Sequence, residues 1–315
     1  MIQSGDDMSR IIVVGDLMTD TVARAARALV KGSVTPAAVT VHGGGSGANI
    51  AAWLAADGAE VAFVGRRGSD TAGRTRDMEL KAYGVDARLA VDPGQPTGTC
   101  VVIVTHKGDH TMLCDLGANA ALSPQDLPDD LFTHGSHLHV SGYTLLNEGS
   151  RPAAVAAMER AGQAEMTISV DGGSAAPLEH VGPGRFLDSA DGATLLLLNG
   201  AQATVFTGSE DPVQAIRALN AWCAEVVVKL GPDDALYANG QGPVRVPAQP
   251  PKKFVDGTGA GGAFRAGFLH SWLDNKPPAE ALAHGHWLAA RALGRVGARP
   301  APGVPRAARK LWRWT

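Results

Sequence analysis

Residues 254 to 264, FVDGTGAGGAF, form a small-residue stretch of the kind that binds an anion. Six small residues follow Asp256, and an apolar helix is predicted directly after them. Backbone N–H groups at such a helix start can hold a phosphate, because they have no partner within the helix and the helix dipole favours negative charge. The far end of the stretch, Gly262 and Ala263, carries no acid, base or nucleophile. The sequence thus predicts an anion cradle and leaves open whether it is catalytic.

A second glycine-rich segment, GGGSGAN at residues 43–49, precedes an alanine-rich predicted helix. Its glycines allow the backbone to approach a ligand closely, and the side chains of Ser46 and Asn49 can form hydrogen bonds. Glycine-rich turns between a strand and a helix are also common as purely structural features. Taken alone, this segment leaves a binding role and a structural role equally open.

The elements that would position these segments alternate between strands and helices. Short apolar and β-branched runs predict strands, and longer amphipathic stretches predict helices. The predicted strands lie within 10–16, 60–70, 137–143, 166–172, 193–199 and 225–231, and the predicted helices lie within 43–59, 151–163, 211–223, 261–274 and 278–293. Alternation of this kind indicates a parallel sheet, whose ligands bind at the carboxyl ends of the strands.

Residues 97–117 depart from this alternation. Two apolar runs flank the sequence HKGDH, a pattern typical of an antiparallel hairpin. Together with the poorly periodic segment 19–42, the hairpin is expected to form a small lid sheet outside the main sheet. The predicted organisation is an α/β core of residues 10–18, 43–96 and 118–300, a β lid of residues 19–42 and 97–117, and a C-terminal tail of residues 301–315.

The composition indicates a cytoplasmic protein. With 315 residues, 45% apolar residues and a net charge of -3, the chain can bury a large core and has no basic excess to attract nucleic acid or an anionic membrane. Its three widely spaced cysteines form no CxxC or metal-binding pattern. The N-terminal MIQSGDDMSR lacks the apolar segment of a secretory signal, and no apolar run is long enough to span a bilayer. We therefore expect no nucleic-acid or membrane partner.

The order of five segments resembles the PfkB, or ribokinase-like, family of sugar and nucleoside kinases. These segments are VVGDLMTD, GGGSGANIAAWLAADGAEVAFVGRRGSD, PTGTCVVIV, DLGANAALSPQDL and DGTGAGGAFRAGF, and the similarity extends over residues 10–300. The resemblance implies a three-layer, Rossmann-like α/β core with a small β-sheet lid. It also implies phosphorylation of a substrate hydroxyl by ATP with Mg²⁺, and a lid through which two chains can pair as a homodimer.

On the substrate side, the resemblance places Asp20 where the family uses an acid to bind substrate hydroxyls. It places Gly45, Ser46 and Asn49 on the turn that contacts the sugar. A sugar requires converging hydrogen-bond donors and acceptors, which these residue types supply. The expected ligand is a small sugar or nucleoside.

Other polar residues near predicted strand ends are less specific. Asp16 is a second candidate acceptor for the substrate, with a helix-cap or turn role equally open. Tyr143 falls at a position that varies with substrate in the family, where it can contact the sugar or serve in packing. His137 and His139 alternate along a predicted strand, which would suit a wall of the substrate site.

On the phosphoryl side, the family motif D-T-x-G-A-G-D corresponds to residues 256–262. The residues matched to the anion hole are Gly259, Ala260 and Gly261, with Asp256 and Thr258 assigned to cofactor binding just before them. The final Asp of the motif, which in the family takes the proton from the attacking hydroxyl, is Gly262 here. General-base assistance contributes about 10²- to 10⁴-fold, so we expect slow chemistry. Rescue by another acid, such as Asp256, stays open.

The nucleotide side departs from the family pattern at further positions. The family motif N-x-x-E, which organises Mg²⁺ through water, runs here from Asn199 to Gln202, and glutamine lacks the negative charge that a hard cation prefers. The nucleotide turn runs from Gly231 to Asp234, with Lys229 just before it, and Gly257 replaces the usual Thr or Ser of the phosphoryl loop. The cofactor-binding residues implied on this side are Asn199, Gln202, Lys229 and Gly231, with no direct protein ligand to the metal.

Two functions are compatible with these residues. The leading one is ATP-dependent phosphorylation of a sugar or nucleoside, impaired by Gly262 in the position of the catalytic Asp. The alternative is a non-catalytic pseudokinase that binds a ligand or a protein partner. The alternative is favoured by the joint presence of Gly262, Gln202, Asp234 and Gly257.

Overall fold

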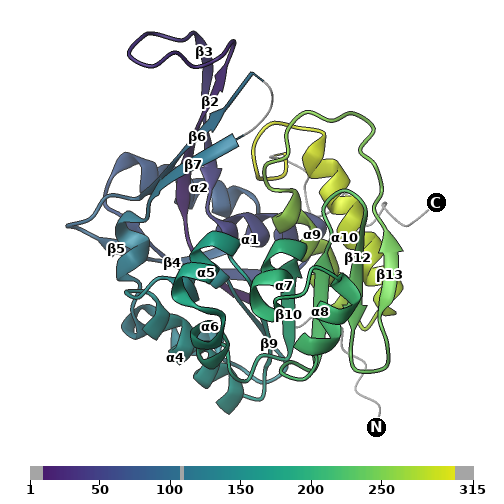
Figure 1. Ribbon diagram of the computed structural model, residues 1–315. Helices are drawn as coiled ribbons and strands as arrows, with labels where there is room; N and C mark the ends of the chain where they lie inside the picture. Colours follow the sequence, from purple (N-terminus) through teal and green to yellow (C-terminus); the bar gives the residue numbers. More distant parts are fainter. Residues whose placement is uncertain (1–9, 107–109, 302–315) are drawn as a thin grey trace.

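The computed structural model describes residues 10–106 and 110–301, and these form two sheets with helices around the larger one (Figure 1). The larger sheet has nine strands in the order β13-β12-β11-β10-β9-β8-β1-β4-β5. Its strands are β1 (Ile11–Val14), β4 (Val61–Gly68), β5 (Asp86–Asp92), β8 (His137–Val140), β9 (Thr167–Asp171), β10 (Leu195–Asn199), β11 (Glu225–Lys229), β12 (Asp234–Ala238) and β13 (Val244–Pro247). The strands from β11 to β5 in this order are parallel, whereas β12 and β13 are antiparallel additions at one edge.

Helices cover both faces of the large sheet because its strands alternate apolar side chains between two cores. One core contains Ile12, Val14 and side chains of the helices α4 (Arg151–Gln163), α5 (Ala175–Val181), α6 (Pro183–Ser189), α7 (Gly200–Thr207) and α8 (Pro212–Leu219). The other contains Ile11, Val13 and side chains of α1 (Ser46–Asp57), α2 (Thr71–Ala82), α9 (Ala260–Leu273) and α10 (Pro278–Leu293). The predicted three-layer α/β architecture is thus confirmed.

The smaller sheet contains the predicted hairpin and also the segment that the sequence left without clear periodicity. Its strands are β2 (Met18–Ala25), β3 (Ala37–Gly44), β6 (Gly98–Val104) and β7 (His110–Asp115), in the order β3-β2-β6-β7. Strands β6 and β7 pair antiparallel, as the hairpin pattern predicts. One face of the sheet packs around Val22 and Val102, which are almost fully buried.

Local boundaries differ from the sequence predictions in a few places. The helix predicted for 211–223 ends at Leu219, four residues early, because the chain turns there toward β11. Several helical segments were not predicted: the helices α2, α3 (Gly142–Leu146), α5, α6 and α7, and the 3-10 turns Gly117–Ala121, Pro124–Asp126 and Asp129–Leu131. Apart from Ala301, the predicted C-terminal tail lies outside the described residues.

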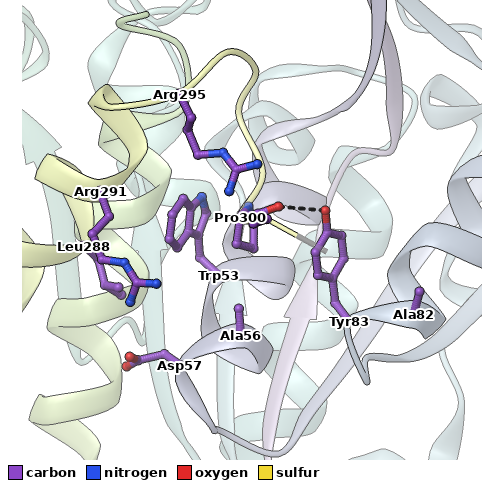
Figure 2. Close-up of a pocket in the computed structure, with 10 residues that line it drawn as sticks. Trp53, Ala56, Asp57, Ala82, Tyr83, Leu288, Arg291, Arg295 and Pro300 are labelled. Atoms are coloured by element: carbon purple, nitrogen blue, oxygen red, sulfur yellow. Dashed lines mark hydrogen bonds between the residues drawn. The ribbon is translucent and has the colours of Figure 1, made fainter. Parts of the chain in front are cut away.

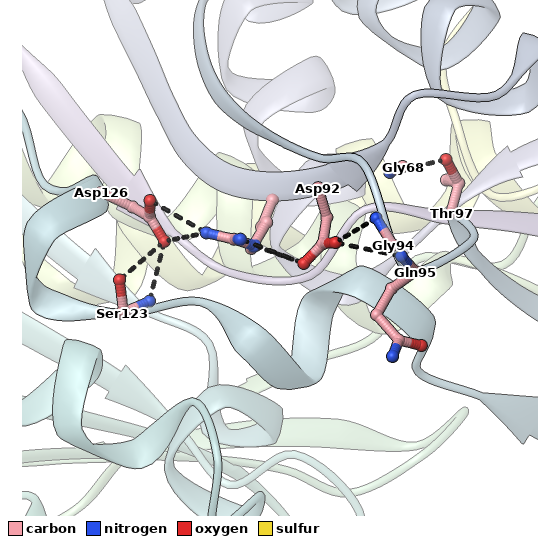
Figure 3. A network of polar contacts seen from close by, with 8 residues as sticks. Gly68, Asp92, Gly94, Gln95, Thr97, Ser123 and Asp126 are labelled. Carbon is pink, nitrogen blue, oxygen red and sulfur yellow. Dashed lines mark hydrogen bonds and ion pairs between the residues drawn. The ribbon is translucent and has the colours of Figure 1, made fainter.

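A polar network fixes the entry to the small sheet (Figure 3). Arg66 at the end of β4 forms ion pairs with Asp92, at 3.0 Å, and with Asp126, at 2.8 Å. The backbone N–H of Gly68 donates to the Thr97 hydroxyl at 3.0 Å, immediately before β6. The residue that precedes β6 is therefore connected to the carboxyl end of β4. Folds of this class bind their ligands at the carboxyl ends of parallel strands.

Candidate active site

Asp20 lies on β2 against the first glycine-rich turn. A Cβ atom added to Gly44 would lie 2.1 Å from the Asp20 Oδ1, so the carboxylate packs directly on the turn backbone. Burial raises the pKa of Asp20 to about 6, although the charge of Arg299 opposes this rise. The structure thus brings together the predicted substrate acid and the predicted sugar-contacting turn.

Asp16 holds the start of α1. Its carboxylate accepts hydrogen bonds from the backbone N–H groups of Ser46, at 2.8 Å, and Gly47, at 3.1 Å. The Ser141 hydroxyl donates to it at 3.3 Å. Burial raises the pKa of Asp16 even though the two N–H donors lower it. Of the roles left open by the sequence, these contacts are those of a helix cap supplied from another strand.

The turn itself requires glycine at position 45. Gly45 has φ 93°, in the left-handed region, and an added Cβ would lie 2.3 Å from the Asp16 carbonyl oxygen. Asn49 follows on the first turn of α1 and is buried. Its side-chain oxygen accepts a hydrogen bond from the Arg299 Nε at 3.1 Å. The amide of this predicted sugar-binding residue is therefore held by a residue 250 positions away in the chain.

Arg299 is a site residue that sequence reasoning missed. Its guanidinium is buried and also donates to the Gly44 carbonyl oxygen at 2.9 Å and to Glu79 at 3.0 Å. Burial lowers the pKa of Arg299 to about 10. No local pattern marks this arginine, because its partners come from distant segments.

The segment around Arg299 joins the two glycine-rich loops. The backbone N–H of Gly297 donates to Asp256 at 3.1 Å, and the Trp53 indole donates to the Ala298 carbonyl oxygen at 2.9 Å. Figure 2 shows Tyr83 donating to the Pro300 carbonyl oxygen, at 2.9 Å, beside a small pocket into which Arg291 and Arg295 extend. That pocket lies at the C-terminal end of α1, whereas the predicted substrate residues lie at its N-terminal end.

The segment predicted to be an anion cradle lies at the start of α9. Gly259 is the N-cap with φ 81°, and no side chain caps the helix. An added Cβ at Gly259 would lie 2.5 Å from the Ala298 Cα, so only glycine fits. The N–H groups of the first helical turn, residues 260–262, are therefore open to an anion.

Gly262 leaves space where the family places its base. An added Cβ would be 3.7 Å from the Ile50 Cγ1 and 3.9 Å from the Asn49 Cβ, which are ordinary contact distances. This position thus faces the predicted sugar-binding turn. Asp256 does not fill it, because its carboxylate accepts hydrogen bonds from the Thr258 N–H and hydroxyl, at 3.0 and 2.8 Å, and from Gly297.

The residues matched to Mg²⁺ organisation form a helix cap. Asn199 and Gln202 make a capping box at the start of α7, in which each side chain accepts the backbone N–H of the other. The Gln202 Nε2 also donates to the Gly173 carbonyl oxygen at 2.7 Å, and the residue is fully buried. Within residues 10–106 and 110–301, no group of three His, Cys, Asp or Glu residues could hold a metal ion. The side chain of Gln202 therefore offers no negative charge to a Mg²⁺ ion held through water.

Two charges flank the nucleotide turn. The Lys229 ammonium, at the end of β11, donates to the Gly231 carbonyl oxygen at 2.7 Å. Asp234 forms an ion pair with Arg245. The acid that the sequence places near the phosphates of ATP is thus paired with a cation.

Tyr143 lies near Asp16 at the wall of a small pocket that also contains Asn119. Burial raises the pKa of Tyr143 to about 12.

The expectation that His137 and His139 form a substrate wall is wrong, because both are fully buried. Their rings bond to the Ser169 hydroxyl between β8 and β9, at 2.8 and 2.9 Å, since that face of the strand packs under helices.

Comparisons with known proteins agree with this architecture. The family described as pfkB family carbohydrate kinase matches residues 8–304. An ATP-dependent ribose-1-phosphate kinase of Halopiger xanaduensis is 30% identical over 82% of this chain and 83% of its own. The solved aminoimidazole riboside kinase of Salmonella enterica, complexed with aminoimidazole riboside and an ATP analogue, has a TM-score of 0.77 at 26% identity, over 96% of this chain and 99% of its own. An adenosine kinase of Sinorhizobium meliloti superposes with a TM-score of 0.87 at 24% identity, over 96% and 99% of the two chains.

Within the part of the chain that the structure describes, no helix combines the length and the apolar character of a membrane span.

Proposed function

Since the chain belongs to the pfkB family of carbohydrate kinases, we propose that it binds a sugar or nucleoside together with ATP and transfers the γ-phosphoryl group to a ligand hydroxyl slowly. The observation that carries this proposal is the position of the cradle. Gly262 at the start of α9 faces Asn49 on α1, so a hydroxyl bound at the first turn would meet a phosphate bound at the second. Phosphoryl transfer depends chiefly on such positioning and on charge stabilisation.

The substrate half of the site supports sugar binding. Asp20 is ionised above a pH of about 6, and a carboxylate is a strong acceptor for sugar hydroxyls. Gly45 brings the turn backbone within reach of the same space, and Arg299 fixes Asn49. We expect the ligand hydroxyls to bind between Asp20 and this turn.

The phosphoryl half supports only slow transfer. The open N–H groups at the start of α9 can stabilise a transferring phosphoryl group. The proton of the attacking hydroxyl has no acceptor at position 262, and Asp256 is engaged by three donors. The absence of a general base corresponds to a loss of about 10²- to 10⁴-fold in rate.

A second candidate function is a pseudokinase that binds its ligand without turnover. The observation that favours it is the Gln202 side chain, which is fully buried and bonded on both its oxygen and its nitrogen. A group that caps a helix in this way is unavailable to water or metal at the phosphates. In that case the chain would retain sugar binding and lose catalysis.

The small sheet supports a homodimer. Val41, Val101 and Leu113 lie in one row across β3, β6 and β7 and are 59%, 37% and 59% exposed. Val39 on the same face is 60% exposed. Exposed apolar side chains gathered on one sheet face are typical of a protein interface, and a two-fold dimer would bury them against the same face of a second copy. From the composition, we also propose that the protein is cytoplasmic.

The test is a panel of sugars and nucleosides incubated with ATP and Mg²⁺, with product measured by mass spectrometry against a no-enzyme control. We expect slow product from wild type and none from Gly259→Val, whose side chain would collide with Ala298 and distort the cradle. Calorimetry with the same panel separates the two candidates, because a pseudokinase binds a sugar and yields no product. Failure to bind any member of the panel would refute both.

A further inference from the structure

The two strands of the hairpin in the small sheet carry a pair of facing cysteines. Cys100 on β6 lies directly opposite Cys114 on β7 in the antiparallel register. Directly opposed residues of such a pair have their Cα atoms about 4.5–5.5 Å apart and their side chains on one face of the sheet. This spacing lies within the range over which a disulfide joins two cysteines, about 4.4–6.8 Å.

The two sulfur atoms of this pair are in contact. The Cys100 Sγ and the Cys114 Sγ lie 2.6 Å apart, and both thiols are free. The third cysteine of the chain, Cys223, is buried in the core of the large sheet, where its Sγ lies 3.3 Å from the carbonyl oxygens of Ala193 and Glu225. Cys100 and Cys114 can therefore bond to each other with little movement, and Cys223 stands apart from them.

The two thiols differ in their access to solvent. Cys114 is exposed, whereas Cys100 is 5% exposed and packs with Val22 and Val102. Burial raises the pKa of the Cys100 thiol, and the contact with Cys114 and the charge of Asp20 raise it further. Because the thiolate rather than the thiol attacks a disulfide, a dissolved reagent is expected to react first at Cys114.

The cysteine pair shares a sheet face with the predicted substrate acid. Asp20 on β2 pairs with Cys100 in the parallel register, so Asp20, Cys100 and Cys114 form one row across three strands. Side chains alternate along a strand, so Leu113 and the other side chains of the proposed dimer interface lie on the opposite face. Pairing of two chains through that interface would leave Cys114 accessible.

We propose that Cys100 and Cys114 form a reversible disulfide by exchange with a low-molecular-weight disulfide such as oxidised glutathione. The Cys114 thiolate attacks one sulfur of the reagent, which forms a mixed disulfide and releases one glutathione thiolate. The Cys100 sulfur then attacks the Cys114 sulfur, which forms the protein disulfide and releases the second glutathione thiolate. The two released thiolates take up the two protons that the protein thiols lose, so two electrons pass from the protein to the reagent.

This exchange requires no kinase activity, and reduced glutathione reverses it. Disulfides in cytoplasmic proteins are usually transient and serve in catalysis or in redox sensing. The exposed thiol that reacts first and the buried thiol that completes the bond are the two parts that such a redox site needs. Its place in the row of Asp20 puts the redox site beside the predicted substrate acid.

The test is a thiol count and a peptide mass map of the full chain, first reduced with dithiothreitol, then freed of it and incubated with oxidised glutathione. We expect two of the three thiols to disappear, the peptides that contain Cys100 and Cys114 to be linked, and dithiothreitol to restore both thiols. Cys100→Ala should stop after the first step and keep one glutathionyl group at Cys114. Cys114→Ala should react at least about tenfold more slowly than wild type, because the remaining thiol of the pair is buried. Cys223→Ala is the matched control and should form the same disulfide as wild type.

Thermal melting under reducing conditions establishes that each variant is folded, and the wild-type measurement depends on no variant. Retention of all three thiols in wild type would overturn the proposal. A disulfide that includes Cys223, or one that joins two chains in a non-reducing gel, would also overturn it. Uptake of glutathione by Cys114→Ala at the wild-type rate would refute the assigned order of the two steps.

Discussion

Replacing Gly262 with aspartate tests directly whether the site lacks only a general base. A side chain at Gly262 fits without displacing its neighbours, since its Cβ would lie 3.7 Å from the Ile50 Cγ1 and 3.9 Å from the Asn49 Cβ. The backbone there is helical, so aspartate needs no unusual conformation. Gly262→Asp would place a carboxylate between the cradle and the predicted sugar-binding turn.

The expected gain in rate follows from general-base catalysis. A positioned base contributes about 10²- to 10⁴-fold, which corresponds to about 3–5 kcal/mol of activation free energy. Folding should not oppose the change, because position 262 is the third residue of α9 and an acid in the first turn stabilises a helix by about 0.3–1 kcal/mol. A rate increase should therefore appear in a variant that is as stable as wild type or more so.

The assay is the initial rate of product formation with the best ligand of the panel, at saturating ATP, for wild type, Gly262→Asp and Gly262→Asn. Asparagine has the shape of aspartate and cannot accept the proton, so it is the matched control and should remain at the wild-type rate. A rise of less than tenfold in Gly262→Asp, with ligand and ATP affinities unchanged, would refute the idea that the missing base limits turnover. A similar rise in Gly262→Asn would show that filling the space, rather than the base, matters.

Three further predictions concern other parts of the site. Protonation of Asp20 should weaken sugar affinity below a pH of about 6. In wild type the raised pKa of Asp20 lowers the free energy of unfolding as pH rises from 3.8 to about 6. Asp20→Asn should therefore gain stability relative to wild type across that range, which thermal melting at several pH values measures. Arg299→Gln should lower the free energy of unfolding by about 1–3 kcal/mol in urea titrations and also weaken sugar binding, because Asn49 loses its donor; unchanged values would contradict the role given to Arg299. Leu113→Lys should shift the chain from dimer to monomer in analytical ultracentrifugation, and a wild-type monomer would refute the proposed interface.

The sequence alone was sufficient for the features that depend on neighbouring residues. The period of apolar residues and the glycine positions predicted the alternating core, the hairpin at 97–117 and both glycine-rich loops, because strand, helix and turn preferences act over a few residues. The absence of an acid at Gly262 is equally local, since it is visible in residue types. The segment 19–42 was harder, because its strands β2 and β3 are partly exposed and lack a strong alternation.

Only the tertiary structure decided which side chains remain free to bind a ligand. By residue type Asp16 suits a substrate contact and a helix cap equally, and the N–H groups of Ser46 and Gly47 that donate to it assign the cap. Asp256 and Gln202 are acceptable ligands by type, yet distant or neighbouring backbone groups engage them.

The sequence therefore determined the fold, the two loops and the missing base of this protein. The tertiary structure determined the availability and the charge of the groups around those loops. The physical reason is the sequence distance over which each effect acts. Helix, strand and turn preferences depend on adjacent residues, whereas burial, hydrogen bonds and electrostatic contacts join positions as far apart as Asn49 and Arg299.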